Sequence, residues 1–443
     1  MIATGLGRML GAEPMAAADA TFLFLEAPGL PMHVAGLAIL DPARGARGPI
    51  RPEELRERVR ERLPLLPSLR RRPLAIPFDL GRPLWLADPE FDLDRHLSFH
   101  RLPPRAGHRH LLALAARLHA QPLPRRRPLW EMTLIDGLPG GRQALLTRLH
   151  HALADGIAGV ETVATIFDGP PVTPNADRTS TPRARPAFGR ETDPGPAPAT
   201  AAGIVRHLAR GPLVPPGPFN GRVGPRRAFA TADLPMDLIE QVRGTLGGTI
   251  DDVALAAVML GLDRHLRRAG AEVAGRRLRV MLPVAIPGLH DGSANRVSAI
   301  FVDLRLGRPP AECLDQVRKA KAAGRRWHEA TALATALAGV EFLAAPVQAT
   351  LARALARLPF AHLIVSDVPG LPEPPRLLGA PLIGAYPLLP LAPCLGLSLG
   401  MLTVGRTMGL GVVADPDLVP RAATLARDVV VGLVRLAAAG RRG

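Results

Sequence analysis

A segment rich in proline, alanine and arginine, from about residue 169 to about residue 224, divides the chain into two halves. Its apolar residues keep no helical or strand period, so it cannot bury enough surface to offset the entropy of ordering. Each flanking half contains both strand-like and helix-like patterns, and 443 residues are enough for two such units. We therefore predict two α/β lobes, 15–168 and 225–443, a linker at 169–224, and a flexible amino terminus at 1–14.

Apolar residues that recur every three to four positions predict the helices, and short apolar or alternating runs predict the strands. The predicted helices are 52–63, 109–119, a helix after Gly156, 233–245 with Asp233 as N-cap, 250–268, 309–327, 333–358 with a break near Pro346, and 420–438. The predicted strands are 132–136, the run before His150, 278–284, 297–304, 363–366, 395–401 and 408–413.

Residues 377–405 carry no charge and are long enough to cross a bilayer. Four prolines, beginning at Pro381 and ending at Pro393, prevent a continuous helix there. From Leu395 onward, leucine and methionine alternate with small residues, which is the period of a strand. We therefore predict no transmembrane helix and expect any membrane contact to be peripheral.

Arginine supplies most of the formal net charge of +16. Such a surface can attract anionic lipid headgroups or the phosphates of a nucleotide-bearing substrate. Nucleic acid is a weaker expectation, because aromatic residues make up only 4% and no binding motif is present. The two cysteines, Cys313 and Cys394, lie far apart in sequence, which fits a reducing compartment. The amino terminus does not resemble a signal peptide.

Residues 149–156 have the sequence Leu-His-His-Ala-Leu-Ala-Asp-Gly, and this motif is the candidate catalytic site. An apolar run precedes the histidines and a helical pattern follows Gly156, so the pair lies where a strand passes into a helix. Histidine takes and returns protons near neutral pH. A structural histidine is the simpler reading of such a pair, and a zinc site is another. Zinc sites need three or four ligands at recognisable spacing, and this chain has neither His-Glu-x-x-His nor paired cysteines.

Taken with other blocks, this motif resembles that of the bacterial wax ester synthase/acyl-CoA:diacylglycerol acyltransferase family. That family is one of the CoA-dependent acyltransferases that carry His-His-x-x-x-Asp-Gly. The matching blocks occur in family order and cover nearly the whole chain. They are Asp19–Leu23, Pro31–Val34, Arg127–Glu131, Thr249–Val253, Asn295–Ser298 and Ser366–Gly370.

The resemblance implies a two-lobed, chloramphenicol acetyltransferase-like fold, with mixed sheets flanked by helices and an active-site tunnel between the lobes. It implies acyl-CoA as donor and diacylglycerol or a long-chain alcohol as acceptor, with no metal and no cofactor. A cytoplasmic enzyme held peripherally at a membrane or lipid inclusion is expected. Oligomeric state is not indicated. The same motif also serves relatives that acylate other alcohols or amines, and a lipid-binding relative with weak turnover is a further alternative.

The resemblance assigns the general base to His151, which would deprotonate the acceptor hydroxyl. The role of the neighbouring His150 is open. We expect Asp155 to lock the loop through a salt bridge to an arginine rather than to act as a third member of a triad. Gly156 would let the backbone turn tightly.

Two positions depart from the family pattern, because Asp251 and Asp367 stand where the family usually has asparagine. An amide can donate a hydrogen bond to an oxyanion, whereas an ionised carboxylate can only accept one. The oxyanion donor is therefore not fixed; Ser366 and the block that contains Asp251 and Asp252 are the candidates. The Pro128-Leu129-Trp130 block is a candidate for substrate binding.

Overall fold

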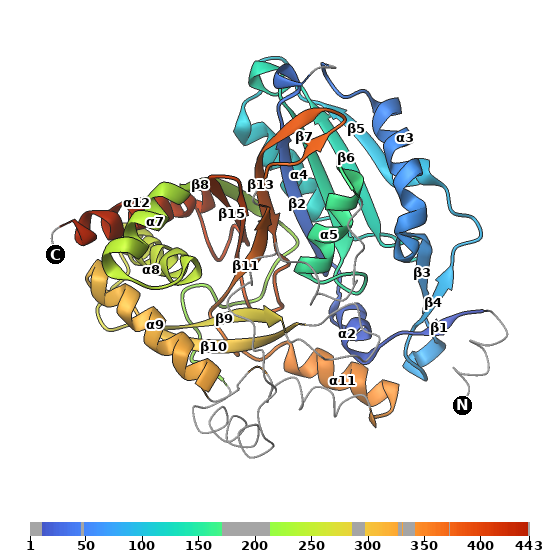
Figure 1. The fold of residues 1–443 in the computed structure, drawn as a ribbon. Helices are drawn as coiled ribbons and strands as arrows, with labels where there is room; N and C mark the ends of the chain where they lie inside the picture. The colour runs from blue at the N-terminus through green and yellow to red at the C-terminus, as the bar shows by residue number, and fades with distance from the viewer. Residues whose placement is uncertain are drawn as a thin grey trace.

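The computed structural model describes residues 11–45, 48–170, 213–285, 297–326, 330, 342–371 and 373–441. Within these ranges the chain forms two lobes, each built on a six-stranded mixed sheet, as Figure 1 shows. Most predicted helices and strands are present within one to three residues of their expected bounds. Asn295, Arg296 and Trp327, and most of the predicted linker, lie outside the described residues, and the linker and lobe boundaries stay predictions.

The first-lobe sheet carries the histidine motif on a central strand. Its order is β12 (Arg376–Leu377), β13 (Ala380–Leu388), β2 (His33–Leu40), β7 (Gln143–His150), β6 (Trp130–Asp136) and β5 (Leu97–Arg101). One face packs on α4 (His108–His119), and the other on α3 (Pro52–Arg62) and α5 (Gly156–Ile166). A smaller sheet joins β1 (Glu13–Pro14), β4 (Leu84–Ala87) and β3 (Arg71–Leu74).

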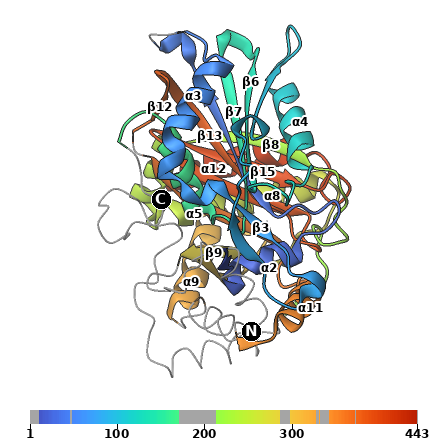
Figure 2. The same ribbon diagram turned by 90° about the vertical axis from the view of Figure 1, so that its right-hand side faces the viewer.

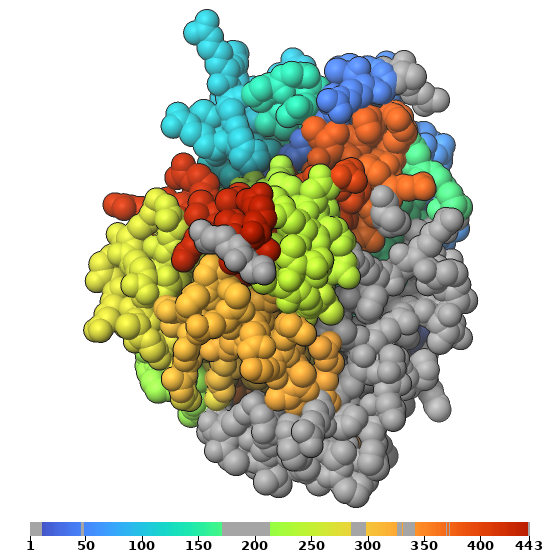
Figure 3. Space-filling view, turned by 60° about the vertical axis from the view of Figure 1, so that its left-hand side comes forward, coloured from blue at the N-terminus to red at the C-terminus, as the bar shows by residue number. Residues whose placement is uncertain are grey.

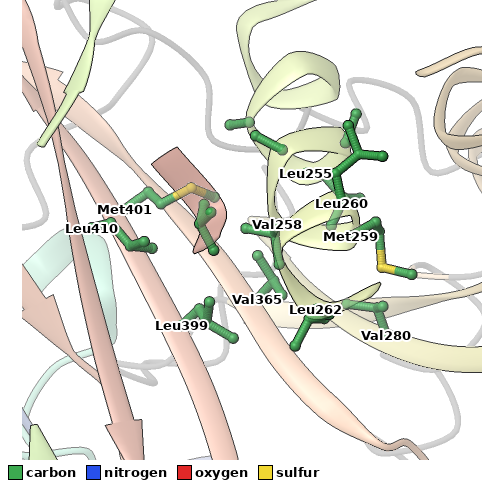
Figure 4. Close-up of a cluster of buried hydrophobic side chains, with 14 of the residues drawn as sticks. Leu255, Val258, Met259, Leu260, Leu262, Val280, Val365, Leu399, Met401 and Leu410 are labelled. Carbon is green, nitrogen blue, oxygen red and sulfur yellow. The ribbon is translucent and has the colours of Figure 1, made fainter. Parts of the chain in front are cut away.

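The second-lobe sheet has the order β10 (Val297–Arg305), β9 (Arg277–Ala285), β11 (Leu363–Leu371), β14 (Leu397–Val404), β15 (Thr407–Ala414) and β8 (Ala228–Pro235). Its helices are α7 (Met236–Leu246), α8 (Ile250–Arg268), α9 (Pro310–Arg326) and α12 (Ala422–Gly440). Leu255, Val258 and Leu262 of α8 face the aliphatic side chains of the sheet (Figure 4). On the outer face, α7 in lime, α9 in orange and the end of α12 in red lie together (Figure 3).

Strand β13 comes from the carboxyl-terminal half of the chain, yet it pairs with β2 of the first sheet. It crosses β14 and β15 at close range, because these strands present glycine there. A Cβ on Gly411 would lie 2.0 Å from the carbonyl oxygen of Pro387, and one on Gly409 would lie 2.1 Å from that of Ala385. The small residues that alternate along 396–411 therefore let one sheet approach the other, a use that the strand period alone did not reveal.

Two local predictions are wrong. Asp233 does not cap a helix: it lies in β8, and Pro235 is the N-cap of α7. The strand predicted at 363–366 does not end there, because β11 continues to Leu371 with an irregularity after Val368. Pro369 has no N–H to donate to the ladder, which accounts for a break in register rather than an end to the strand.

Two helices join the lobes at the lower edge of the molecule. Figures 1 and 2 show α2 (Ala17–Leu25) beside α11 (Ala345–Leu355), although more than 300 residues separate them in sequence. Among the described helices, none alone is long and apolar enough to cross a membrane. Only α7 and α8 together pass on length and composition, and they meet at a bend of 102°.

Candidate active site

The two histidines of the motif have different surroundings. His150 is the last residue of β7 and is fully buried, whereas His151 begins the following turn and is half-buried. The His150 N–H donates to the carbonyl of Leu129 at 2.9 Å, and the His151 N–H donates to that of Met32 at 2.8 Å. Neighbouring segments thus fix the backbone of both residues, and of the two residues only His151 has exposed surface.

Both nitrogens of the His150 ring face protein atoms. Nδ1 accepts from the Ala152 N–H at 3.1 Å, so the proton of the neutral ring lies on Nε2, which is 3.5 Å from Oε1 of Glu26. Burial lowers the pKa of His150, although Glu26 opposes the shift. Burial alone would raise the pKa of Glu26, but His150 and Arg125 together lower it to about 2. A neutral His150 therefore faces an ionised Glu26.

Asp155 caps α5, the helix that follows the motif. Its Oδ1 accepts from the N–H groups of Ile157 and Ala158 at 3.0 and 2.8 Å. The carboxylate is fully buried and lies at the positive end of the helix. This geometry agrees with the expected loop-orienting role. Gly156 begins the helix, and the residue nearest to its missing Cβ is Val368 of the second lobe, at 3.7 Å.

That contact places the Ser366–Gly370 block beside the motif. Successive side chains of a strand point to opposite faces, so Ser366 shares a face of β11 with Val368, which packs into the first-lobe core. Val365 packs into the second-lobe core instead, and Asp367 shares its face of the strand. Ser366 therefore lies on the face of β11 that packs toward the first lobe, and Asp367 lies on the opposite face.

The other candidate block, Asp251 and Asp252, opens α8 in the second lobe. Asp252 forms a capping box with Thr249, accepting from its N–H at 2.9 Å, and pairs with the buried Lys321 at 2.6 Å. Asp251 is half-buried in the first turn. No described hydrogen bond or ion pair of Asp251 or Asp252 reaches the histidine loop.

The Pro128-Leu129-Trp130 block lies in the core of the first lobe. Leu129 and Trp130 are fully buried. The Trp130 indole N–H donates to the Leu69 carbonyl at 2.8 Å, and its ring stacks on His96 with 4.4 Å between centroids. Leu129 holds the His150 backbone, so this block supports the site through packing; the structure leaves Trp130 no surface with which to touch a substrate.

Sequence reasoning assigned no role to three residues beside the histidines: Phe22, Glu26 and Arg125. The Phe22 ring stacks on the His151 ring, with centroids 3.9 Å apart and planes 12° apart. Arg125 donates to Oε2 of Glu26 from Nε and Nη2 at 3.0 and 2.9 Å. Phe22 lies in the amino-terminal block that carried the resemblance, which was the available signal; nothing in the sequence connected Glu26 or Arg125 to the motif.

Within the described residues, no group of three or more His, Cys, Asp or Glu side chains could hold a metal ion. Two cavities lie away from the motif. One, of about 320 Å³, lies between α3 and the β12–β13 turn, and the other, of about 480 Å³, lies along α9. The tunnel between the lobes stays a prediction.

Comparison with known proteins identifies the chain. Residues 15–210 and 190–254 match the model of the wax ester synthase/diacylglycerol acyltransferase catalytic domain, and residues 293–437 match its carboxyl-terminal domain. A Mycobacterium tuberculosis protein described as a probable diacylglycerol O-acyltransferase is 33% identical over 391 residues, covering 83% of this chain and 84% of its own.

Solved structures show the same fold. The wax ester synthase/diacylglycerol acyltransferase of Marinobacter aquaeolei superposes with a TM-score of 0.71 at 22% identity, covering 97% of this chain and 100% of its own. The trichothecene 15-O-acetyltransferase of Fusarium sporotrichioides gives a TM-score of 0.64 at 14% identity, with 96% and 94% covered. At these identities the likeness concerns the fold alone. The two family models and the mycobacterial relative establish that this chain belongs to the wax ester synthase/diacylglycerol acyltransferase family of acyltransferases.

Proposed function

We propose that the chain transfers a long-chain acyl group from acyl-CoA to diacylglycerol, and that long-chain alcohols serve as further acceptors. The observation that carries this proposal is the pair of unlike histidines in a chain of this family. His150 has both nitrogens facing protein atoms, whereas His151 is only half-buried and follows the end of a fixed strand. A base that must meet an acceptor hydroxyl needs this exposure.

In the proposed reaction, His151 takes the proton of the acceptor hydroxyl as the oxygen attacks the thioester carbonyl. A tetrahedral oxyanion forms, the carbon–sulfur bond breaks, and the proton passes from His151 to the CoA thiolate. The products are an ester and free CoA, with His151 again neutral. General-base catalysis of this kind contributes about 10²–10⁴-fold in rate, and positioning of the two substrates supplies a further large factor.

The oxyanion needs a donor, and the position of Ser366 supports it over the two aspartates. Ser366 shares its strand face with Val368, which touches the start of α5. Asp251 and Asp252 open a helix in the second lobe. Loss of one oxyanion donor commonly costs about 10²–10³-fold in turnover. We expect a Ser366→Ala variant to lose turnover with little change in acyl-CoA binding; unchanged turnover would remove Ser366 from this role.

Incubation of the purified protein with labelled acyl-CoA tests the function. Release of CoA with diacylglycerol or hexadecanol, together with about 10²–10⁴-fold slower release by His151→Ala, is the expected result. Undiminished turnover by His151→Ala would contradict the assignment of the base. Turnover only with other acceptors would reassign the substrate, and lipid binding without turnover would indicate a non-catalytic relative.

We further propose that the protein acts in the cytoplasm, at a lipid surface, through apolar side chains of α11 and the adjacent turn η4 (Pro77–Asp79). Phe78 and Leu80 are 91% and 63% exposed, and Val347 on α11 is 50% exposed. The Arg353–Asp79 ion pair, at 2.9 Å, joins the turn to the helix. Exposed apolar patches of this kind commonly mark interaction sites, and the net charge of +16 favours anionic headgroups.

Co-sedimentation with phosphatidylglycerol vesicles tests this attachment. We expect a Phe78→Ser/Leu80→Ser variant to bind the vesicles more weakly than the unaltered protein. Leu65→Ser is a matched control, because Leu65 is 44% exposed but lies on a different turn, Leu63–Leu65. Equal binding by all three proteins would contradict the proposed surface.

A further inference from the structure

Helix α2 contacts both histidines of the motif. Phe22 and Glu26 are four residues apart, which places them one above the other on the same side of the helix end. The Phe22 ring stacks on His151 at 3.9 Å, and Oε1 of Glu26 lies 3.5 Å from Nε2 of His150. One helix thus supplies a separate contact to each ring.

Glu26 is itself held on several sides. Its side chain is only 8% exposed, and both donor atoms of Arg125 that reach it bind Oε2. Arg125 Nη2 also donates to the Leu23 carbonyl at 2.8 Å, which ties the arginine to the last turn of α2. The Met32 N–H lies 3.4 Å from Oε1 of Glu26, and the Met32 carbonyl accepts from the His151 N–H. The carboxylate therefore contacts the residue before β2 that bonds the His151 backbone.

The contact with His150 controls the shape of the turn. With the proton of the ring on Nε2, facing Glu26, Nδ1 is free to accept from the Ala152 N–H at 3.1 Å. The His150 carbonyl accepts from the Leu153 N–H at 2.8 Å. His150 thus braces residues 150–153 from inside, and His151 lies within that braced turn. The Ala152 N–H sets this tautomer, and the Glu26 carboxylate, 3.5 Å from Nε2, favours the proton on that nitrogen.

The stack with Phe22 acts on the His151 ring directly. A parallel aromatic neighbour at this distance restricts rotation of the imidazole about its χ2 angle. The face of a phenyl ring is negative, so it also favours the imidazolium that forms when His151 accepts a proton. The stack therefore both orients the base and favours its protonated form.

We propose that α2 is the positioning element of the catalytic base, with Phe22 and Glu26 as positioning residues, Phe22 acting on His151 directly and Glu26 acting through His150. The inference rests on the proposed role of His151. It gives the amino-terminal block of the sequence a function in the site, and it gives His150 the role of a brace. Because α2 packs against α11 of the second lobe, it also connects the position of the base to the contact between the lobes.

The test compares Phe22→Leu and Glu26→Gln with Thr21→Val, which alters α2 at a side chain whose described hydrogen bond runs to Ala17 of the same helix. We expect kcat to fall on the order of 10–10²-fold in the first two variants, with KM for acyl-CoA nearly unchanged, because misplacement of a base by about 1 Å can cost 10²-fold. Thr21→Val should keep the kcat of the unaltered protein. Phe22→Tyr keeps an aromatic face, so it should keep most of the kcat that Phe22→Leu loses.

A pH profile separates positioning from a general loss of structure. The acidic limb of kcat/KM reports the pKa of the base in the free enzyme. Removal of the phenyl face or of the Glu26 charge destabilises the imidazolium, so the limb should move to lower pH in both variants. The same shift should appear in an NMR titration of ¹³C-labelled His151, which needs no turnover and shows whether each variant is folded.

Turnover and the NMR titration together distinguish a failure of the base assignment from a failure of the positioning role. If His151→Ala keeps full turnover, the assignment of His151 as the base fails, and the positioning role fails with it. If His151→Ala is inactive while a variant at Phe22 or Glu26 matches Thr21→Val in kcat, pH profile and His151 pKa, the function stands and the positioning role of that residue is overturned.

Discussion

The two lobes have similar sheets but different interiors. In the first lobe, titratable side chains lie buried beneath the histidine strand: His33, His119, Arg148 and His150 are all at most 3% exposed. Figure 4 shows the contrasting region in the second lobe, where leucine, valine and methionine from α8 meet the sheet. The polar interior of the first lobe lies next to the proposed catalytic histidine. The aliphatic interior of the second lobe lies on the opposite face of the second-lobe sheet.

The buried polar groups of the first lobe are bonded to backbone carbonyls and to one another. His33 Nε2 donates to the His119 carbonyl at 2.8 Å, and Arg148 donates to the carbonyl of Gln121 at 2.9 Å and to the carboxylate of Glu131. Such networks fix one arrangement but contribute less stability than apolar packing. The comparison indicates that apolar packing between α8 and its sheet supplies stability, whereas the buried histidines and arginine beneath the histidine strand hold a geometry and respond to pH.

The largest expected effect comes from the buried pair that interrupts the apolar character of the second lobe. A Lys321→Met variant leaves Asp252 buried without its cation and should lose about 3–5 kcal/mol of stability. Lys321→Met/Asp252→Asn removes both charges and keeps an oxygen for the Thr249 cap, so it should recover much of that loss. Urea denaturation measures both variants. A double variant no more stable than the single one would show that the pair contributes by more than charge balance.

A cavity in the aliphatic core should lower stability without affecting the chemistry. Leu399 is fully buried in β14 and faces α8 (Figure 4). Leu399→Ala should cost about 2–5 kcal/mol, while the turnover of the folded fraction stays unchanged. Thermal unfolding and kcat, measured on the same sample, check this prediction. A fall in kcat comparable to that of an active-site variant would contradict the separation between the lobes.

Acid should act mainly on the first lobe. Burial lowers the pKa of His33 and His119 well below the usual value of 6.5. Below pH 6.5 the unfolded chain therefore binds protons that the native state does not, so stability is full above this pH and falls as the pH decreases. The slope is about 1.4 kcal/mol per pH unit for each such histidine.

Substitution of one histidine tests this slope. His119→Leu replaces the buried ring with an apolar side chain of similar size, so its stability should fall less between pH 6.5 and pH 5 than that of the unaltered protein. Urea denaturation at the two pH values gives the difference. As a control, Leu399→Ala should shift the whole curve down and leave the pH dependence as it was. An unchanged slope in His119→Leu would mean that His119 is protonated in the native state.

The local periodicity of apolar residues was sufficient to predict many of the helices and strands. Helices α3, α4 and α12 have apolar stripes and α8 is apolar over most of its length, and the structure contains all four. The strand pairing of β13 with β2 could not be read from the sequence, because a strand carries no signal for a partner more than 300 residues away. The same limit explains why Asp233 was wrongly predicted to cap a helix. Asp233 accepts a hydrogen bond from the Tyr386 hydroxyl, and this bond depends on how the two sheets meet.

The same limit applies to the candidate site, where the sequence predicts only residues that lie close together along the chain. The histidine loop, Asp155 and Gly156 are neighbours in sequence, so a short motif contained them. Phe22 and Glu26 reach the loop only because α2 folds back on the strand end, and Arg125 in turn reaches Glu26. No spacing in the sequence encodes that approach. Trp130 belongs to a block that was a candidate for substrate binding, and the structure shows this side chain fully buried in the first-lobe core.

The smallest expected effect concerns Asp251, the first of the two positions where an acid replaces the usual amide. Its carboxylate lies in the first turn of α8, where free N–H groups and the helix dipole favour negative charge. Asp251→Asn should therefore cost about 0.3–1 kcal/mol of stability and leave the rate of esterification unchanged. Urea denaturation and the acyl-CoA assay measure the two quantities. A large gain in rate would place Asp251 at the reacting carbonyl, and would extend the chemistry from the polar first lobe into the apolar second one.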